Sequence, residues 1–156
     1  FKETSSTFQQ SSSFLNTIAQ IKLLTEAEFN YKVSPVNYMV YYLNLNFWLD
    51  ESYLNFGFSN YFEEEDKLIN VLLNMPFSER VRFSYGLIKT SPGFGIDYEL
   101  TENLLWTTLR VYNFEDPYLD FYLKYHVFKN IYLNSGYNEF NKDSRSIFVG
   151  FSFSQN

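Results

Sequence analysis

The stretch NYMVYYLNLNFWL, residues 37–49, alternates large apolar side chains with polar ones. Leu43 and Leu45 fall on one side of an extended chain, and Asn44 and Asn46 fall on the other. An alternation of period two is typical of a β-strand whose two faces meet different surroundings. This segment therefore predicts a strand with one apolar face and one polar face.

The same alternation continues to the end of the chain. The expected strands are 26–33, 37–49, 53–62, 68–77, 80–89, 94–100, 105–111, 119–127, 131–137 and 147–153. Short turn segments separate them and leave no room for a crossover helix, so consecutive strands must pair antiparallel. Such a meander removes its edges best by closing on itself. The sequence predicts an all-β fold: an antiparallel up-and-down β-barrel of about ten strands, preceded by an N-terminal α-helical segment.

The last strand, IFVGFSF at 147–153, closes this expected barrel. It must pair with the first strand near Phe29 and Tyr31. Before the barrel, residues 1–24 carry apolar residues in a loose heptad pattern that is typical of a helix. The sequence thus divides into 1–24, a helical lead or a flexible linker, and 26–154, the barrel.

Composition excludes several classes of function. The net charge of −6, without a cluster of Lys and Arg, argues against a nucleic-acid partner. His126 is the single histidine and there is no cysteine, so a catalytic triad or a multi-histidine metal site lacks its parts. The acidic run 63–66 is expected to be a solvated loop rather than a cation site. We expect no enzyme, no cofactor and no metal.

The barrel can close in two ways. A membrane barrel turns the apolar face to lipid and the polar face to its lumen, whereas a soluble barrel does the reverse. The polar face favours the membrane barrel, because it is rich in Asn, Ser, Gly and Thr, which suit a narrow lumen. Its charges have opposite signs on neighbouring strands, which predicts a charge network in the lumen. That network comprises Arg80, Arg82, Asp97, Glu99, Arg110, Asp120 and Lys124.

Aromatic residues near the strand ends are expected to form girdles at the two membrane interfaces. The candidates are Trp48, Tyr53, Phe62, Phe77, Trp106, Phe114, Phe128, Tyr132 and Phe140.

Two segments, GLIKTSPGFGIDYEL at 86–100 and RVYNFEDPYLDFYLKYHVFKNIYLNSGYNEF at 110–140, suggest a family. They resemble the C-terminal region of a subset of MCE proteins, the MlaD-like components of bacterial lipid transporters. The matching positions are Gly86, Leu87, Ile88, Gly93, Gly95, Asp97, Tyr98, Asn113, Phe114, Pro117, Leu119, Phe128, Lys129, Asn130, Tyr132, Leu133 and Gly136.

The resemblance implies a function in the periplasm or outer membrane of a Gram-negative bacterium. The barrel would be the outer-membrane end of a system that moves phospholipids between the two membranes, with a docking and delivery role and no catalysis. The implied partners are phospholipids, the outer membrane, further copies in a homo-hexamer, and an inner-membrane ABC permease complex. Expected lipid-facing or lipid-route residues are Phe1, Phe8, Phe14, Leu15, Ile18, Leu54, Phe56, Phe58, Phe83, Phe121, Phe151 and Phe153.

Two alternatives remain open at this point. One keeps the lipid-transport system but inverts the barrel into a soluble periplasmic module with an apolar interior. The other is a stand-alone small outer-membrane barrel of porin or adhesin type, for which residues 1–24 are only a linker.

Overall fold

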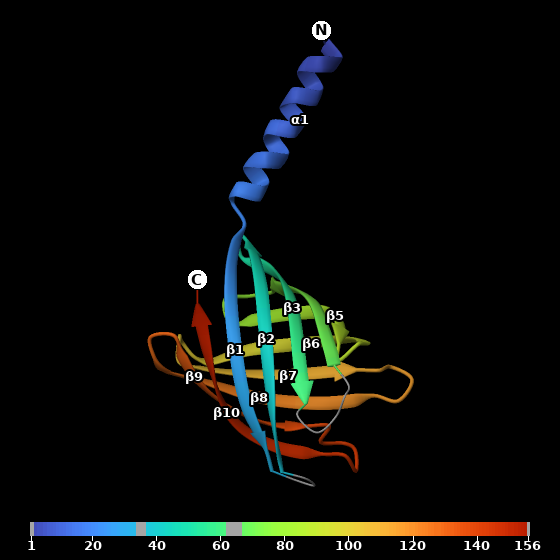
Figure 1. The fold of residues 1–156 in the computed structure, drawn as a ribbon, viewed down its shortest axis with the longest axis vertical. Helices are drawn as coiled ribbons and strands as arrows, with labels where there is room; N and C mark the ends of the chain where they lie inside the picture. Colours follow the sequence, from blue (N-terminus) through green and yellow to red (C-terminus); the bar gives the residue numbers. More distant parts are fainter. Residues whose placement is uncertain (1, 34–36, 62–66, 156) are drawn as a thin grey trace.

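The computed structural model describes residues 2–33, 37–61 and 67–155, apart from the side chains of residues 2–5, 8, 61 and 67. One helix precedes ten strands (Figure 1). The elements are α1 (Lys2–Ala19), β1 (Lys22–Lys32), β2 (Tyr38–Leu49), β3 (Ser52–Tyr61), β4 (Lys67–Pro76), β5 (Val81–Ile88), β6 (Ser91–Thr101), β7 (Leu105–Tyr112), β8 (Tyr118–Phe128), β9 (Ile131–Asn138) and β10 (Ser146–Gln155).

The ten strands form a closed antiparallel barrel in which each strand pairs with its neighbours in the sequence and β1 pairs with β10. The predicted fold class is confirmed. In the closing pair, Phe29 lies opposite Phe151 and Tyr31 lies opposite Val149, as expected from the sequence. The rings of Phe29 and Phe151 are 5.6 Å apart, a contact that adds to the backbone hydrogen bonds of this seam.

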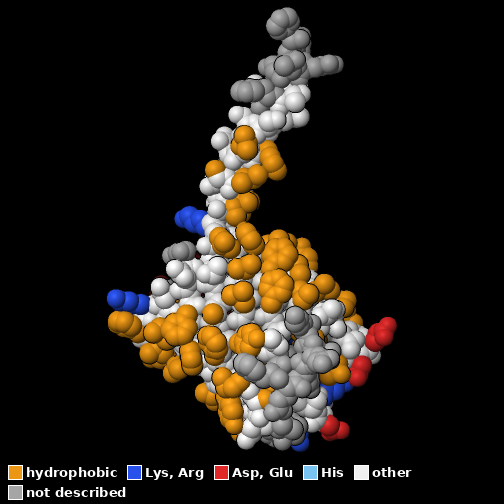
Figure 2. All heavy atoms as spheres, viewed as in Figure 1, with side chains coloured by type: hydrophobic (Ala, Val, Ile, Leu, Met, Phe, Trp, Pro, Cys, Tyr) orange, Lys and Arg blue, Asp and Glu red, His pale blue; other side chains and the backbone are white. Residues whose placement is uncertain are grey.

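The apolar face of every strand points outward. One exposed apolar residue from each strand, β1 to β10, illustrates this arrangement: Phe29, Leu43, Phe58, Ile69, Tyr85, Phe94, Leu109, Phe121, Leu133 and Phe151. Figure 2 shows hydrophobic side chains, in orange, gathered over the barrel surface on the side in view. The opposite positions point into the lumen, and there Asn30, Asn74 and Asn134 are buried. The interior is lined largely by polar side chains, so the apolar interior expected in the soluble alternative is wrong.

Glycine makes space in this narrow lumen. Gly57 lies between Asn44 of β2 and Asn70 of β4, and a Cβ atom there would be 2.7 Å from Asn44 Oδ1. Gly150 lies in the same way between Asn30 and Asn134, and its Cβ would be 2.1 Å from Asn30 Oδ1 and 2.1 Å from the Phe29 carbonyl oxygen. Long polar side chains thus occupy the space above a glycine on the neighbouring strand.

Both chain ends lie at one end of the barrel, which we call the terminal end, and the opposite end is the distal end (Figure 1). Helix α1 extends away from the terminal end. The first strand begins at Lys22, not at residue 26, so the predicted boundary is shifted. The reason is pairing, because Lys22, Leu23 and Leu24 continue the ladder opposite Trp48, Phe47 and Asn46.

We expect Gly150→Val to destabilise the barrel by about 1–3 kcal/mol, because overpacking forces shifts in the surrounding backbone and side chains. Chemical unfolding followed by circular dichroism measures this change. The control is Val149→Leu, since Val149 is 57% exposed on the exterior and tolerates added volume. Equal stability of the two variants would contradict the packing described for the lumen.

Candidate functional site

The distal half of the lumen is filled by side chains. Val40, Ile88 and Phe148 are at most 1% exposed, and Tyr112 is 4% exposed. The rings of Tyr112 and Tyr118 stack with their centroids 5.5 Å apart. Ile88, Tyr112 and Tyr118 belong to one apolar cluster in this half of the barrel.

A buried ion pair lies within the same half. Lys89 Nζ is 3.0 Å from Asp120 Oδ2, and Asp120 is fully buried. The Asp120 carboxylate also accepts hydrogen bonds from Tyr122 Oη at 2.7 Å and from the backbone N–H of Glu139 at 2.8 Å. Because each carboxylate oxygen has donors, the charge is compensated despite its removal from water.

The turn between β5 and β6 positions Lys89. Lys89 and Thr90 both have positive φ, 47° and 68°, which suits a two-residue hairpin but is unfavourable for residues other than glycine. The backbone N–H of Lys89 donates to Asn70 Oδ1 at 2.6 Å, and its Nζ donates to Tyr112 Oη at 3.0 Å. These contacts hold the lysine inside the lumen in spite of the unfavourable backbone.

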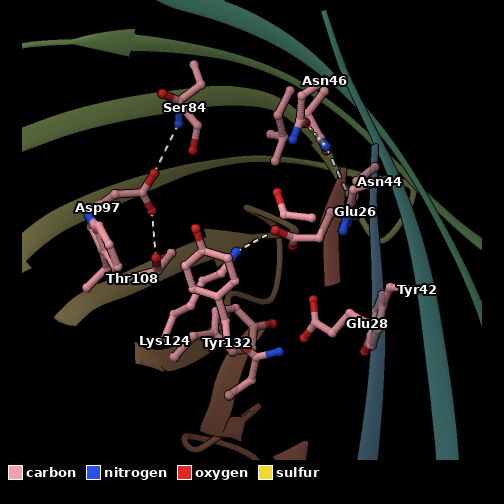
Figure 3. Close-up of a pocket in the computed structure, with 18 of the residues that line it drawn as sticks. Glu26, Glu28, Tyr42, Asn44, Asn46, Ser84, Asp97, Thr108, Lys124 and Tyr132 are labelled. Atoms are coloured by element: carbon pink, nitrogen blue, oxygen red, sulfur yellow. Dashed lines mark hydrogen bonds and ion pairs between the residues drawn. The ribbon is translucent and has the colours of Figure 1, made fainter. Parts of the chain in front are cut away.

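A cavity of about 360 Å³ occupies the terminal half of the lumen. It extends from Trp48, Trp106 and Tyr132 near the terminal end to Phe148, one of the side chains that fill the distal half. Most of its wall is polar, as the close-up shows (Figure 3). Polar and charged wall residues are Glu26, Glu28, Asn30, Asn44, Asn46, Asn55, Asn70, Asn74, Arg82, Ser84, Asp97, Thr108, Arg110, Lys124 and Asn134.

Two hydrogen-bonded groups cross this wall (Figure 3). Lys124 Nζ lies 2.5 Å from Glu26 Oε2, joining β8 to β1. Asp97 accepts from Thr108 Oγ1 at 2.6 Å and from Asn74 Nδ2 at 3.0 Å. The first group links β8 to β1, and the second links β6 to β7 and to β4, so the wall is braced by side chains as well as by the sheet.

The structure places most of the predicted charge network inside. Arg82, Asp97, Arg110, Asp120 and Lys124 point into the lumen. Two other members of the predicted set lie elsewhere. Arg80 is exposed in the turn before β5, because β5 begins only at Val81. Glu99 lies near the terminal end, where its Oε1 accepts from the backbone N–H of Asn103 at 2.6 Å.

The pairing within this network differs from the prediction. Arg82 lies directly opposite Asp97, yet the ion pairs of the lumen join Lys89 to Asp120 and Lys124 to Glu26. In both pairs the two residues belong to elements that are not adjacent in the sheet. In a narrow lumen, long side chains from strands that are not adjacent can contact each other directly. The register of neighbouring strands does not predict such contacts.

Sequence reasoning missed four charged residues of the lumen: Glu26, Glu28, Lys32 and Lys89. A signal was available for three of them, because Glu26, Glu28 and Lys32 alternate with the apolar face of the first strand. For Lys89 there was none, because a turn residue has no assigned face.

The predicted lipid-facing residues of the barrel lie on its exterior. Leu54, Phe58, Phe121, Phe151 and Phe153 are 37–46% exposed, and Phe56 and Phe83 share their face and are half-buried. In α1, Phe14 and Leu15 are each 64% exposed and Ile18 is 47% exposed. Phe1 lies outside the described residues, and so does the side chain of Phe8.

The prediction of aromatic girdles requires correction. Trp48, Tyr53, Trp106 and Tyr132 line the cavity instead of the exterior. Their strand parity decides this, because each lies on the polar face. Phe77, Phe114 and Phe128 are 57–73% exposed near the strand ends, Phe140 is half-buried, and Phe62 lies outside the described residues.

His126 lies near the terminal end of the lumen. Its Nε2 is 2.6 Å from the Lys129 carbonyl oxygen, and its ring stacks on Tyr132 with centroids 4.9 Å apart. Its contacts are those of a residue that fixes a turn.

Across the described residues, His, Asp and Glu form no cluster of three or more that suits a metal ion. No helix in the described part of the chain is long and apolar enough to span a membrane. The acidic run 63–66 falls in the segment that the structure leaves undescribed.

Comparison with known proteins identifies the family. The model of a lipocalin-like domain matches residues 25–156, which are most of the chain and all of the barrel except the first three residues of β1. This chain belongs to the lipocalin-like domain family. No curated protein sequence matches it. A solved structure from work on the de novo design of transmembrane β-barrels is 12% identical over 87% of this chain and 96% of that one, with a TM-score of 0.44. Such a score does not establish a shared fold.

The lipocalin-like match overturns the resemblance to MCE proteins, and the homo-hexamer and the ABC permease that followed from it lose their basis. The structure explains why the resemblance misled. Gly93 and Gly136 face the lumen, where a Cβ atom would be 2.6 Å from the Val111 carbonyl oxygen and 2.4 Å from that of Phe121. Lys129 and Asn130 form a tight turn between β8 and β9. The matching positions thus serve barrel packing and turn formation in this lipocalin-like domain.

We expect Lys89→Met to destabilise the lipocalin-like barrel by about 3 kcal/mol or more, because Asp120 would remain buried without its cation. The double variant Lys89→Met/Asp120→Asn should recover much of this loss. Unfolding free energies of the two single variants and the double variant give the coupling directly.

A surface pair provides the control for this cycle. Lys142 contacts Asp116, whose side chain is 69% exposed, so Lys142→Met should cost less than about 1 kcal/mol. A loss for Lys89→Met no larger than that for Lys142→Met would contradict a structural role for the buried pair.

Proposed function

We propose that this barrel is inserted in a lipid bilayer, the outer membrane of a Gram-negative bacterium, as a non-catalytic component. The observation that carries the proposal is the exterior itself. At strand positions whose side chains are described, the outward residues of all ten strands are apolar or uncharged. Monomeric soluble proteins rarely expose contiguous apolar patches larger than a few hundred Å².

The strand lengths support the same proposal. Most strands have 10 to 12 residues and the shortest have 8. A tilted transmembrane β-strand needs about 9–11 residues to cross the hydrocarbon layer. Closure also matters, because a bilayer offers no hydrogen-bond partner to an open sheet edge. The β1–β10 pairing leaves none among the described strands.

The polar lumen is the counterpart of this exterior. Charged residues are costly on the lipid side of a barrel but are acceptable inside, where they pair with one another or with water. The Lys124–Glu26 and Lys89–Asp120 pairs both lie inside. A lipocalin-like fold suggests binding of hydrophobic molecules, and in this chain the exterior offers far more apolar surface than the lumen does. We therefore propose that the hydrophobic molecules it contacts are membrane phospholipids along its outside wall.

Detergent dependence and gel mobility test the proposal. The purified chain should stay folded and monodisperse only in detergent or lipid. Without heating, a folded barrel in detergent should migrate differently in a denaturing gel from a heated sample. A folded and monodisperse barrel in buffer without detergent would overturn membrane insertion.

A depth series on one strand tests the lipid contact itself. We expect Leu43→Arg in mid-strand β2 to reduce the free energy of folding into bilayers by about 2–4 kcal/mol, whereas arginine near the membrane interface costs about 0–1 kcal/mol. Leu49→Arg, at the strand end, is the matched control, since both leucines point outward and are 46% and 38% exposed. Folding titrations in lipid vesicles measure both losses. Equal losses at the two sites would argue against a bilayer around the barrel.

A further inference from the structure

Arg110 of β7 is the unusual charge of the lumen. Its side chain lines the cavity, with the guanidinium carbon 5.2 Å from the centre of the Tyr122 ring. Its Nε is buried and has no hydrogen-bond partner among the described residues. None of the ion pairs found in that part of the chain includes Arg110. Asp120 lies opposite Arg110 in the β7–β8 ladder, but its carboxylate is held by Lys89, Tyr122 and the backbone N–H of Glu139. A cation removed from water is normally compensated by an anion of its own.

The carboxylates around the cavity are already engaged. Glu26 pairs with Lys124, and Glu28 accepts from Asn30 Nδ2 at 2.6 Å. Asp97 accepts from Thr108 and Asn74. Arg82, the other cavity arginine, donates through Nε to Asn74 Oδ1 at 2.5 Å. Arg110 therefore keeps hydrogen-bonding capacity that the wall does not use.

Asn134 adds a second unused donor. Its side chain is 6% exposed and lines the same cavity, and its Nδ2 has no partner among the described residues. The acceptor Asn30 Oδ1, also on the wall, is likewise unpaired. A ligand that reaches these groups supplies an acceptor to Arg110 and Asn134 and a donor to Asn30.

We propose that the cavity binds a small, hydroxylated monocarboxylic acid whose carboxylate is held by Arg110. The planar guanidinium fork matches the geometry of a carboxylate. The volume of about 360 Å³ is large enough for a small molecule. Glu28 and Asp97 on the wall disfavour a ligand with several negative charges, and the asparagines accept hydroxyl donors.

This inference concerns the lumen and holds whether or not a bilayer surrounds the barrel. Tryptophan fluorescence can measure binding in this cavity. The chain has two tryptophans, Trp48 and Trp106, and both line the cavity. Tryptophan fluorescence therefore reports only on this site.

The experiment titrates the folded full chain, in detergent at constant ionic strength, with gluconate and with acetate. Sorbitol serves as the neutral counterpart of gluconate. We expect a saturable fluorescence change with gluconate and a weaker one with acetate, and none with sorbitol. Arg110→Gln should weaken gluconate binding about tenfold or more, because a charge-assisted hydrogen bond is lost.

Two further variants keep the test decisive. Arg110→Lys retains the cation without the fork, so we expect an intermediate affinity even if Arg110→Gln folds poorly. Arg145→Gln removes an exposed arginine and should bind gluconate as the native chain does. The proposal is overturned if neither acid gives a saturable change, if sorbitol binds as well as gluconate, or if Arg110→Lys and Arg145→Gln bind alike.

Discussion

Closure of ten strands into a narrow barrel is the constraint on which the rest of this structure depends. Every second side chain must enter a lumen with room for few large groups. The chain meets this limit by placing glycine beside long polar residues, as at Gly57 between Asn44 and Asn70 and at Gly150 between Asn30 and Asn134. Most of the larger apolar residues lie on the exterior, and only a few, such as Ile88 and Phe148, fill the lumen. The polar lumen and the apolar surface are thus two results of one packing condition.

The lumen itself has two different halves. In the distal half, Ile88, Phe148 and the Lys89–Asp120 pair fill the space. In the terminal half, the wall is braced by hydrogen bonds but a cavity remains. A cavity in one half of the lumen suits the binding of a small molecule. This division is compatible with a lipocalin-like fold.

Much of the architecture could be predicted because β-strand alternation is local. The alternation around Phe29, Val149 and Phe151 predicts which face of the strand each residue lies on. Short turns force antiparallel pairing of consecutive strands. The candidate site was harder to predict. The wall position of Trp48 and Trp106 follows from parity, yet their aromatic character suggested a membrane girdle. The resemblance to MCE proteins is wrong because it rests on glycines and turn residues that this barrel needs for packing.

The sequence alone determined the number of strands, their order and the composition of each face, since these depend on spacing along one chain. Only the tertiary structure decided which face is inside, because an alternating strand is equally consistent with either closure. It also decided the partners of the buried charges. Lys89 meets Asp120 and Lys124 meets Glu26 because barrel curvature brings distant strands within reach of long side chains. Among the described residues Arg110 forms no ion pair, because the carboxylate of Asp120, its neighbour across the ladder, is held by Lys89, Tyr122 and the backbone N–H of Glu139.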